Sequence, residues 1–184
     1  MEQAALKQIT SRQVSTRLIV IALITLSALA YGFGQGPWRQ ASEKELEKTI
    51  PRKAPVVNER IETELRSASG VRDSHGNSIA AAVLITAGYS AEGKYSHYFV
   101  TQVPLQIATF SLAPGEYIFG SNRANDDTLT VTFYEAATGK QIGSVDAKRD
   151  PKRNGVRAVL VNPPADGKGS IRIGRFAFDY SVSK

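Results

Sequence analysis

The chain has 184 residues, no cysteine and a formal net charge of +6. Without cysteine it has no disulfide, no thiol nucleophile, no Cys-ligated zinc and no lipid-modified cysteine. From Gln35 onward, 20 Lys/Arg against 16 Asp/Glu leave only +4, a surplus too small for the clustered basic face of a nucleic-acid binder. We therefore expect no nucleic-acid partner.

Residues 18–33 form an apolar run with few hydroxyl side chains. At ~1.5 Å per residue the run spans roughly 24 Å, and flanking residues extend it to the roughly 30 Å of a bilayer core. It predicts one transmembrane helix over 18–36 behind a cytoplasmic tail over 1–17. Because Arg17 abuts the run and the far side begins with uncharged residues, the positive-inside rule places the C-terminal domain outside the cytoplasm, in the periplasm.

Small side chains lie along the same segment and permit close contact between helices. We predict that they form a face that docks against other membrane protein subunits in the bilayer; they are Ala22, Ala28, Ala30 and Gly32. Residues 28–30, Ala-Leu-Ala, also match a signal-peptidase site. The alternative is therefore secretion after cleavage following Ala30.

Residues 37–70 are predicted to form a connector with short helices. In "ASEKELEKTIP", Ser42 and Glu45 match a capping box. In "NERIETELRSASG", Ile61 and Leu65 would share one face of a second helix. The connector would hold the following domain away from the bilayer, or lie as a strap along a partner.

Residues 71–184 are predicted to form the extracytoplasmic domain, and their pattern is that of β-strands. "IAAAVLITA" is a continuous apolar run, typical of a strand covered on both faces. "DTLTVTFYE" alternates, with Leu129, Val131 and Phe133 on one face. "AATGKQIGSVDA" predicts a hairpin, because Gly139 supplies the positive φ that such a loop needs.

The last segment, "GSIRIGRFAFDYSV", contains a break in its alternation. Its large apolar residues are odd-numbered up to Ile173 and even-numbered from Phe176. A β-bulge at 174–175 would keep all of them on the core face. About seven short strands with a turn every ten or so residues predict an all-β fold, an antiparallel β-sandwich of the immunoglobulin or prealbumin-like kind.

Two neighbouring patterns carry a family resemblance. "SLAPGEYIFG" followed by "LTVTFYEAATGKQIGSV" resembles the strand-turn-strand sequence of prealbumin-like sandwiches, including the regulatory-type domains appended to many exported proteins. The resemblance implies a non-enzymatic sandwich, and it transfers no catalytic residue to this chain.

Candidates for chemistry are few. Residues 73–75, Asp-Ser-His, are the residue types of a hydrolase triad, but adjacent side chains point apart and predict a polar turn. His97 lies among aromatic residues without a second ligand nearby, which predicts a buried, hydrogen-bonded histidine. Asp126 and Asp127 lack the spacing of a calcium loop. We predict no catalytic residue, no cofactor and no metal site.

One cluster of basic residues stands out in the domain, within "DAKRDPKRNGVR". It predicts either a solvated hairpin tip or a contact for an anionic partner, such as lipid headgroups, an envelope polymer or an acidic face of another subunit. The basic residues are Lys148, Arg149, Lys152, Arg153 and Arg157.

The sequence thus favours a non-catalytic, single-pass membrane-anchored accessory or structural subunit of a larger membrane protein complex, with its domain docked on the extracytoplasmic face. The alternative is an exported binding module for an envelope glycan or small ligand, for which exposed Tyr89, Tyr95 and Tyr98 would form a platform. Only the alternative predicts ligand binding by the isolated domain.

Overall fold

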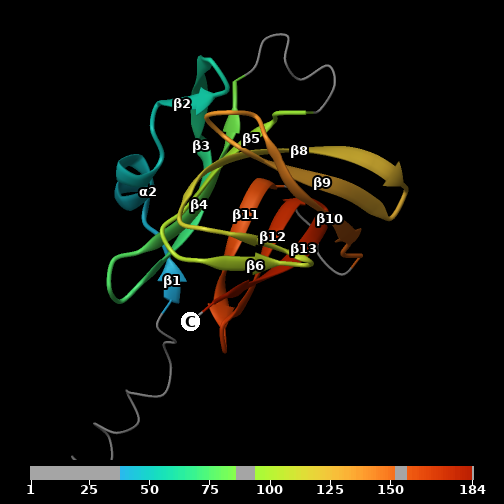
Figure 1. Cartoon of the computed structure of the whole chain (residues 1–184). Coiled ribbons are helices and arrows are strands. Elements are labelled where there is room, and N and C mark those ends of the chain that lie inside the picture. Colours follow the sequence, from blue (N-terminus) through green and yellow to red (C-terminus); the bar gives the residue numbers. More distant parts are fainter. Residues whose placement is uncertain (1–37, 86–93, 152–156, 184) are drawn as a thin grey trace, which may run out of the picture. The chain divides into compact units, whose positions relative to one another are not determined.

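The computed structural model (Figure 1) describes residues 38–85, 94–151 and 157–183. They form antiparallel strands and one short helix, and the chain from Gly36 to Lys184 is one compact unit. In chain order the elements are β1 (Trp38–Gln40), α2 (Glu43–Thr49), β2 (Lys53–Val56), β3 (Glu59–Asp73), β4 (Ser78–Leu84), β5 (His97–Thr101), β6 (Leu105–Ile107), β7 (Phe110–Leu112), β8 (Gly115–Asn125), β9 (Thr128–Glu135), β10 (Gln141–Arg149), β11 (Arg157–Ala165), β12 (Lys168–Gly174) and β13 (Phe176–Val182).

Neighbouring strands of the sheet follow the order β1-β3-β4-β5-β8-β9-β10-β13-β12-β11. In addition, β2 pairs with the start of β3, and the small β6–β7 hairpin pairs with the end of β13. The sheet is curved so strongly that its two ends meet. The Val161 amide on β11 donates a hydrogen bond of 3.0 Å to the Ser69 hydroxyl oxygen on β3.

The prediction of an all-β antiparallel domain is confirmed, but the structure differs from the predicted seven-stranded sandwich. The described residues hold thirteen strands in one connected sheet rather than about seven in two stacked sheets. Alternation and turn residues identify hairpins, yet they do not tell whether the next hairpin extends the same sheet or crosses to a second one. Here most hairpins extend one sheet, and its twist bends it around the core.

The main core fills the concave side of the curved sheet. It contains a cluster of four phenylalanine rings, three of which contact the ring of Phe133, with centroid distances between 5.0 and 6.4 Å within the cluster. Val131 and Phe133 lie fully buried in it, and Leu129 packs against it. The predicted alternation of this strand is therefore confirmed.

A second core lies on the convex side, where α2 and β2 cover β4 and β5 (Figure 1). Leu46 of α2 packs there with Ala80 and Ala82, whereas Ile79 and Ala81 of the same strand face the main core. The prediction that this apolar run is a strand covered on both faces is confirmed.

The predicted connector is corrected by the structure, because residues 38–70 contribute β1, α2, β2 and most of β3 to the domain. The first predicted helix is confirmed as α2. The second is wrong, since its residues belong to strand β3. Ile61 and Leu65 lie four positions apart, and that spacing puts two residues on one face of a strand as well as of a helix. The exposed Glu62 between buried Ile61 and buried Thr63 is the strand signal.

The break in alternation near the C-terminus marks a tight turn instead of the predicted bulge. β12 ends at Gly174 and β13 begins at Phe176, with Ile173 opposite Phe176 in the ladder. Gly174 has a φ of 58°, which a glycine adopts without strain. The turn keeps the apolar residues of both strands on the core side, as predicted.

Candidate functional site

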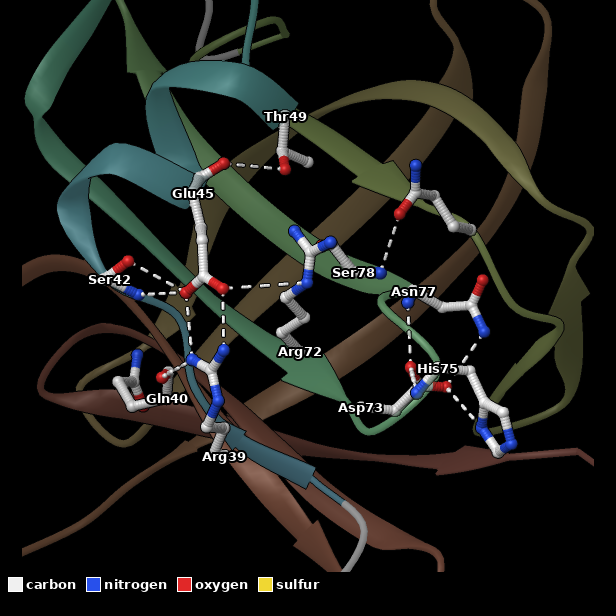
Figure 2. Close-up of polar contacts among 11 residues, drawn as sticks. Arg39, Gln40, Ser42, Glu45, Thr49, Arg72, Asp73, His75, Asn77 and Ser78 are labelled. Carbon is white, nitrogen blue, oxygen red and sulfur yellow. Dashed lines mark hydrogen bonds and ion pairs between the residues drawn. The ribbon is translucent and has the colours of Figure 1, made fainter.

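A polar network surrounds the carboxylate of Glu45 where the chain enters the domain (Figure 2). Arg39 donates from both terminal nitrogens to the two carboxylate oxygens, at 2.9 and 2.6 Å. The Ser42 amide donates to Oε2 at 2.9 Å, and Arg72 Nε lies 3.7 Å from Oε1. The hydrogen bonds from Arg39, followed by those from Ser42, hold the pKa of Glu45 well below its usual range.

The network joins three elements that are distant in sequence. Arg39 belongs to β1, Glu45 to the first turn of α2, and Arg72 to the end of β3. The capping box was visible in the sequence, whereas the two arginines were not, because only the fold brings β1 and β3 beside the helix. The Arg39 and Ser42 donors bond directly to the Glu45 carboxylate and Arg72 adds an ion-pair contact, so the network has a structural role.

Glu45→Gln should lower the melting temperature of the domain by a few degrees, because a neutral amide cannot pair with two guanidinium groups and is a poorer cap. Differential scanning fluorimetry measures the change. Glu47→Gln, on an exposed position of the same helix, is the matched control and should leave the melting temperature unchanged. Equal melting temperatures for the two variants would show that the network adds nothing to stability.

The Asp-Ser-His tripeptide forms the turn between β3 and β4 (Figure 2). Asp73 Oδ1 accepts hydrogen bonds from the His75 and Asn77 amides at 2.9 and 2.8 Å, and Oδ2 accepts one from the Asn77 side chain at 2.9 Å. These bonds outweigh burial and lower the pKa of Asp73. The carboxylate shapes its own turn, which confirms the predicted polar turn.

His97 is buried beside the main core, as predicted. Its ring stacks on Phe119 with 4.6 Å between centroids, and Nδ1 lies 2.8 Å from the Ser96 hydroxyl. Burial lowers the pKa of His97 to about 4, and the Ala158 backbone opposes this shift. Among the described residues Nε2 has no hydrogen-bond partner. The ring is therefore neutral at physiological pH and has no carboxylate to orient it as a general base.

The fold spreads out the predicted basic cluster. Lys148 and Arg149 end β10, and Arg157 begins β11, whereas residues 152 and 153 (Lys and Arg) lie outside the described part of the chain. Strands β13 and β12 run between β10 and β11. Arg149 and Arg157 are consequently about three strand spacings apart, roughly 14 Å.

Acidic neighbours offset two members of this cluster. Lys148 Nζ lies 3.6 Å from an Asp146 carboxylate oxygen and donates to the Thr128 hydroxyl at 3.1 Å. Arg149 Nη1 lies 3.7 Å from an Asp127 carboxylate oxygen. The described part of the cluster thus fits the solvated hairpin tip more closely than a concentrated anion-binding surface.

The predicted helix-docking face, Ala22, Ala28, Ala30 and Gly32, lies outside the described residues, as does the whole segment 18–36. In the part that the structure does describe, no helix is both long and apolar enough to cross a membrane.

Two of the three tyrosines predicted to form a ligand platform in the alternative function are buried. Tyr95 and Tyr98 are 6% and 0% exposed, and the Tyr95 ring packs edge-on against Tyr134 with 5.3 Å between centroids. Tyr89 lies outside the described residues. Two of the three rings therefore belong to the second core and cannot stack on a sugar.

An open groove of about 340 Å³ runs along β2 and β3. Binding pockets for small molecules are lined mainly by apolar side chains, whereas five of the six residues here are polar or charged. They are Arg52, Lys53, Glu62, Thr63, Glu64 and Leu65.

Asp126 and Asp127 shape the β8–β9 turn. The Asp127 amide donates to Asn125 Oδ1 at 3.0 Å, and Asp126 lies 3.5 Å from Arg123 Nη1. Within residues 38–85, 94–151 and 157–183, no group of three or more His, Asp and Glu side chains converges as metal ligands would.

Comparison of the chain with protein families, with curated protein sequences and with solved structures finds no match.

Proposed function

We propose that the protein is a non-catalytic, single-pass membrane-anchored accessory or structural subunit of a larger membrane protein complex. Its N-terminal helix over 18–36 would contact neighbouring subunits and lipid, and its β domain would dock on the extracytoplasmic, periplasmic face. The observation that carries the proposal is the pairing of β1 with β3 at the start of the domain. The chain leaves the apolar run at Phe33 and is bonded into the sheet from Trp38 onward.

The polar groups of the described domain also support a scaffold role. Catalytic groups usually stand with a perturbed pKa in a cleft that a substrate can reach. Here the perturbed carboxylates Glu45 and Asp73 are saturated by bonds within the domain, and His97 is enclosed by the core. Each of these groups has a structural partner in place of an open substrate site.

Intact mass spectrometry of the protein from its native membrane tests the anchor. We expect the full-length mass of 19.9 kDa, because an uncleaved helix keeps residues 1–17. Ala30→Leu should change this mass only by the difference between the two side chains, since it alters only helix packing and the N-terminal segment is retained. If the helix were a signal peptide, the mature chain would begin at Tyr31, and the same substitution would block its processing.

Gentle detergent extraction followed by native gel electrophoresis tests the complex. The proposal expects migration with other membrane subunits, and a lone species of 19.9 kDa would contradict it. Ala28→Leu on the small-residue face should weaken the association if that face packs closely. Leu29→Ile, at the adjacent position, is the volume-matched control and should not.

A further inference from the structure

The edge of β3 that faces away from β4 carries β2 at one end and β1 at the other. The ladder with β2 ends at Lys53, after which the Thr63 amide donates to the Arg52 carbonyl at 3.0 Å. The preceding residues belong to α2, where the Ile50 amide donates to the Leu46 carbonyl at 2.8 Å. β3 therefore continues past the end of β2.

The next residues of β3 also leave the ladder with β4. That ladder stops at Glu64 and resumes at Ser69. In between, the Ser67 hydroxyl donates to the Glu64 carbonyl at 2.6 Å and accepts a hydrogen bond from the Val83 amide at 2.9 Å. The Arg66 amide donates to the Glu64 carboxylate at 3.1 Å. Side chains thus satisfy several backbone groups of this irregular stretch.

Leu65 presents open backbone groups within the same stretch. The amide and carbonyl groups of alternate strand residues point to the same edge, so those of Leu65 point to the β2 side, as those of Thr63 do. In the part of the chain that the structure describes, neither backbone group of Leu65 has a hydrogen-bond partner. Such groups at a strand edge are available to an added strand.

A groove and a small cavity meet at Leu65. The polar groove of about 340 Å³ along β2 and β3 includes Leu65 in its lining. A cavity of about 80 Å³ adjoins the same side chain, and its lining residues are Glu43, Leu46, Glu47, Leu65 and Arg66. When a peptide is recognised by strand addition, main-chain hydrogen bonds give affinity and small pockets select side chains. The polar groove and the cavity between two leucines are suited to these two roles.

The groove also contains a cation that lacks an acidic partner. Lys53 Nζ lies 4.0 Å from a Glu62 carboxylate oxygen. Arg66 Nε lies 3.3 Å from a Glu64 carboxylate oxygen. Arg52, in contrast, forms no ion pair with any residue that the structure describes. A carboxylate from outside the domain would complement its guanidinium group.

We propose that the groove binds the extended C-terminal segment of a partner polypeptide. A segment that adds to Leu65 in line with β2 runs antiparallel to β3, so its C-terminal end points toward Arg52. Its backbone bonds to Leu65, its α-carboxylate pairs with Arg52, and an aliphatic side chain enters the cavity beside Leu46. The inference rests on the proposed function in one respect, namely that a neighbouring subunit supplies the segment. It concerns the described domain alone and does not depend on the anchor.

Peptide selection tests this groove. The full chain in detergent micelles is screened against a library of random hexapeptides that end in a free carboxylate. We expect binders that share an aliphatic residue at one fixed position. Amidation of the C-terminus should weaken a selected peptide about tenfold, because the charge-assisted hydrogen bond to Arg52 is lost. Fluorescence polarisation of the labelled peptide measures the change.

Arg52→Gln is the matching change in the protein. It should weaken binding of the free carboxylate peptide about tenfold and leave binding of the amidated peptide unchanged. Lys140→Gln, at an exposed position between β9 and β10, removes the same charge elsewhere and should affect neither peptide. N-methylation of the peptide amide that bonds to the Leu65 carbonyl should abolish binding, whereas N-methylation of the adjacent amides, which point away from β3, should not.

Failure of the groove and failure of the subunit role give different results. The absence of selected binders, or equal binding of the free and amidated peptides, would overturn the groove, while association of the extracted protein on native gels would still support the subunit role. N-methylation without effect at every position would overturn strand addition. A lone species on native gels, together with selected peptides that depend on Arg52, would contradict the subunit role and leave the peptide site in place.

Discussion

Gly169→Ala should lower the free energy of unfolding of the domain by about 3 kcal/mol. Gly169 of β12 pairs with Tyr180 of β13, whose hydroxyl donates to the Asn162 carbonyl of β11 at 2.8 Å. The Tyr180 ring therefore lies across Gly169 and connects β13, β12 and β11. An added Cβ would lie inside contact distance of the ring, and Tyr180 is too deeply buried to swing aside.

Urea denaturation of the compact unit from Gly36 onward measures this loss. Gly115→Ala is the matched control, because its added Cβ would come no closer than 3.4 Å to the Tyr117 hydroxyl oxygen. That variant should change stability by no more than about 0.5 kcal/mol. Tyr180→Leu removes the ring and should abolish most of the additional penalty of Gly169→Ala in a double-mutant cycle. Similar losses of stability in Gly169→Ala and Gly115→Ala would show that contact between the added Cβ and the Tyr180 ring is not the cause.

Acidification from pH 6.5 to pH 4 should destabilise the domain through His97, by up to about 3 kcal/mol. Burial lowers the pKa of His97 from 6.5 to about 4. Above pH 6.5 the ring is neutral in both the folded and the unfolded chain, so the full stability is present. As the pH falls below 6.5, the His97 side chain binds a proton in the unfolded chain but stays neutral in the folded chain. The free energy of unfolding therefore decreases until the buried ring is protonated near pH 4.

Urea denaturation of the wild type and of His97→Phe at pH 7, 6 and 5 isolates this contribution. Phenylalanine keeps an aromatic ring against Phe119 but does not titrate, so the variant should lose much less stability between pH 6.5 and 5. The pKa values of three carboxyl groups, Glu45, Asp73 and Glu64, are lowered, and their contributions are lost mainly below pH 5, as the same groups protonate in the unfolded chain. His75→Asn is the control for histidine content, since the His75 side chain is 84% exposed. Equal pH slopes for wild type and His97→Phe would contradict the prediction.

Side-chain periodicity was sufficient to identify several of the local elements of this protein. The alternation of Leu129, Val131 and Phe133, the two-sided run of β4 and the positive φ of Gly139 follow from the residues at those positions and their immediate neighbours. The capping box of Ser42 and Glu45 is equally local. The absence of cysteine and the apolar run at 18–33 are likewise properties of the sequence alone.

Only the tertiary structure decided how these elements combine. A spacing of four residues suits one face of a helix and one face of a strand, so Ile61 and Leu65 could not distinguish β3 from a helix until β2 and β4 paired with it. Closure of the sheet depends on Ser69 and Val161, which are far apart in the sequence.

The placement of charge was also decided by long-range contacts. Arg149 and Arg157 are close in the sequence, but β13 and β12 lie between their strands, so the predicted cluster is divided. Conversely, Arg39 and Arg72 are distant in the sequence and meet at Glu45. Side-chain patterns specify which face of an element is apolar, but the pairing of distant strands is set by the packing of the whole chain, and that pairing determines which charges become neighbours.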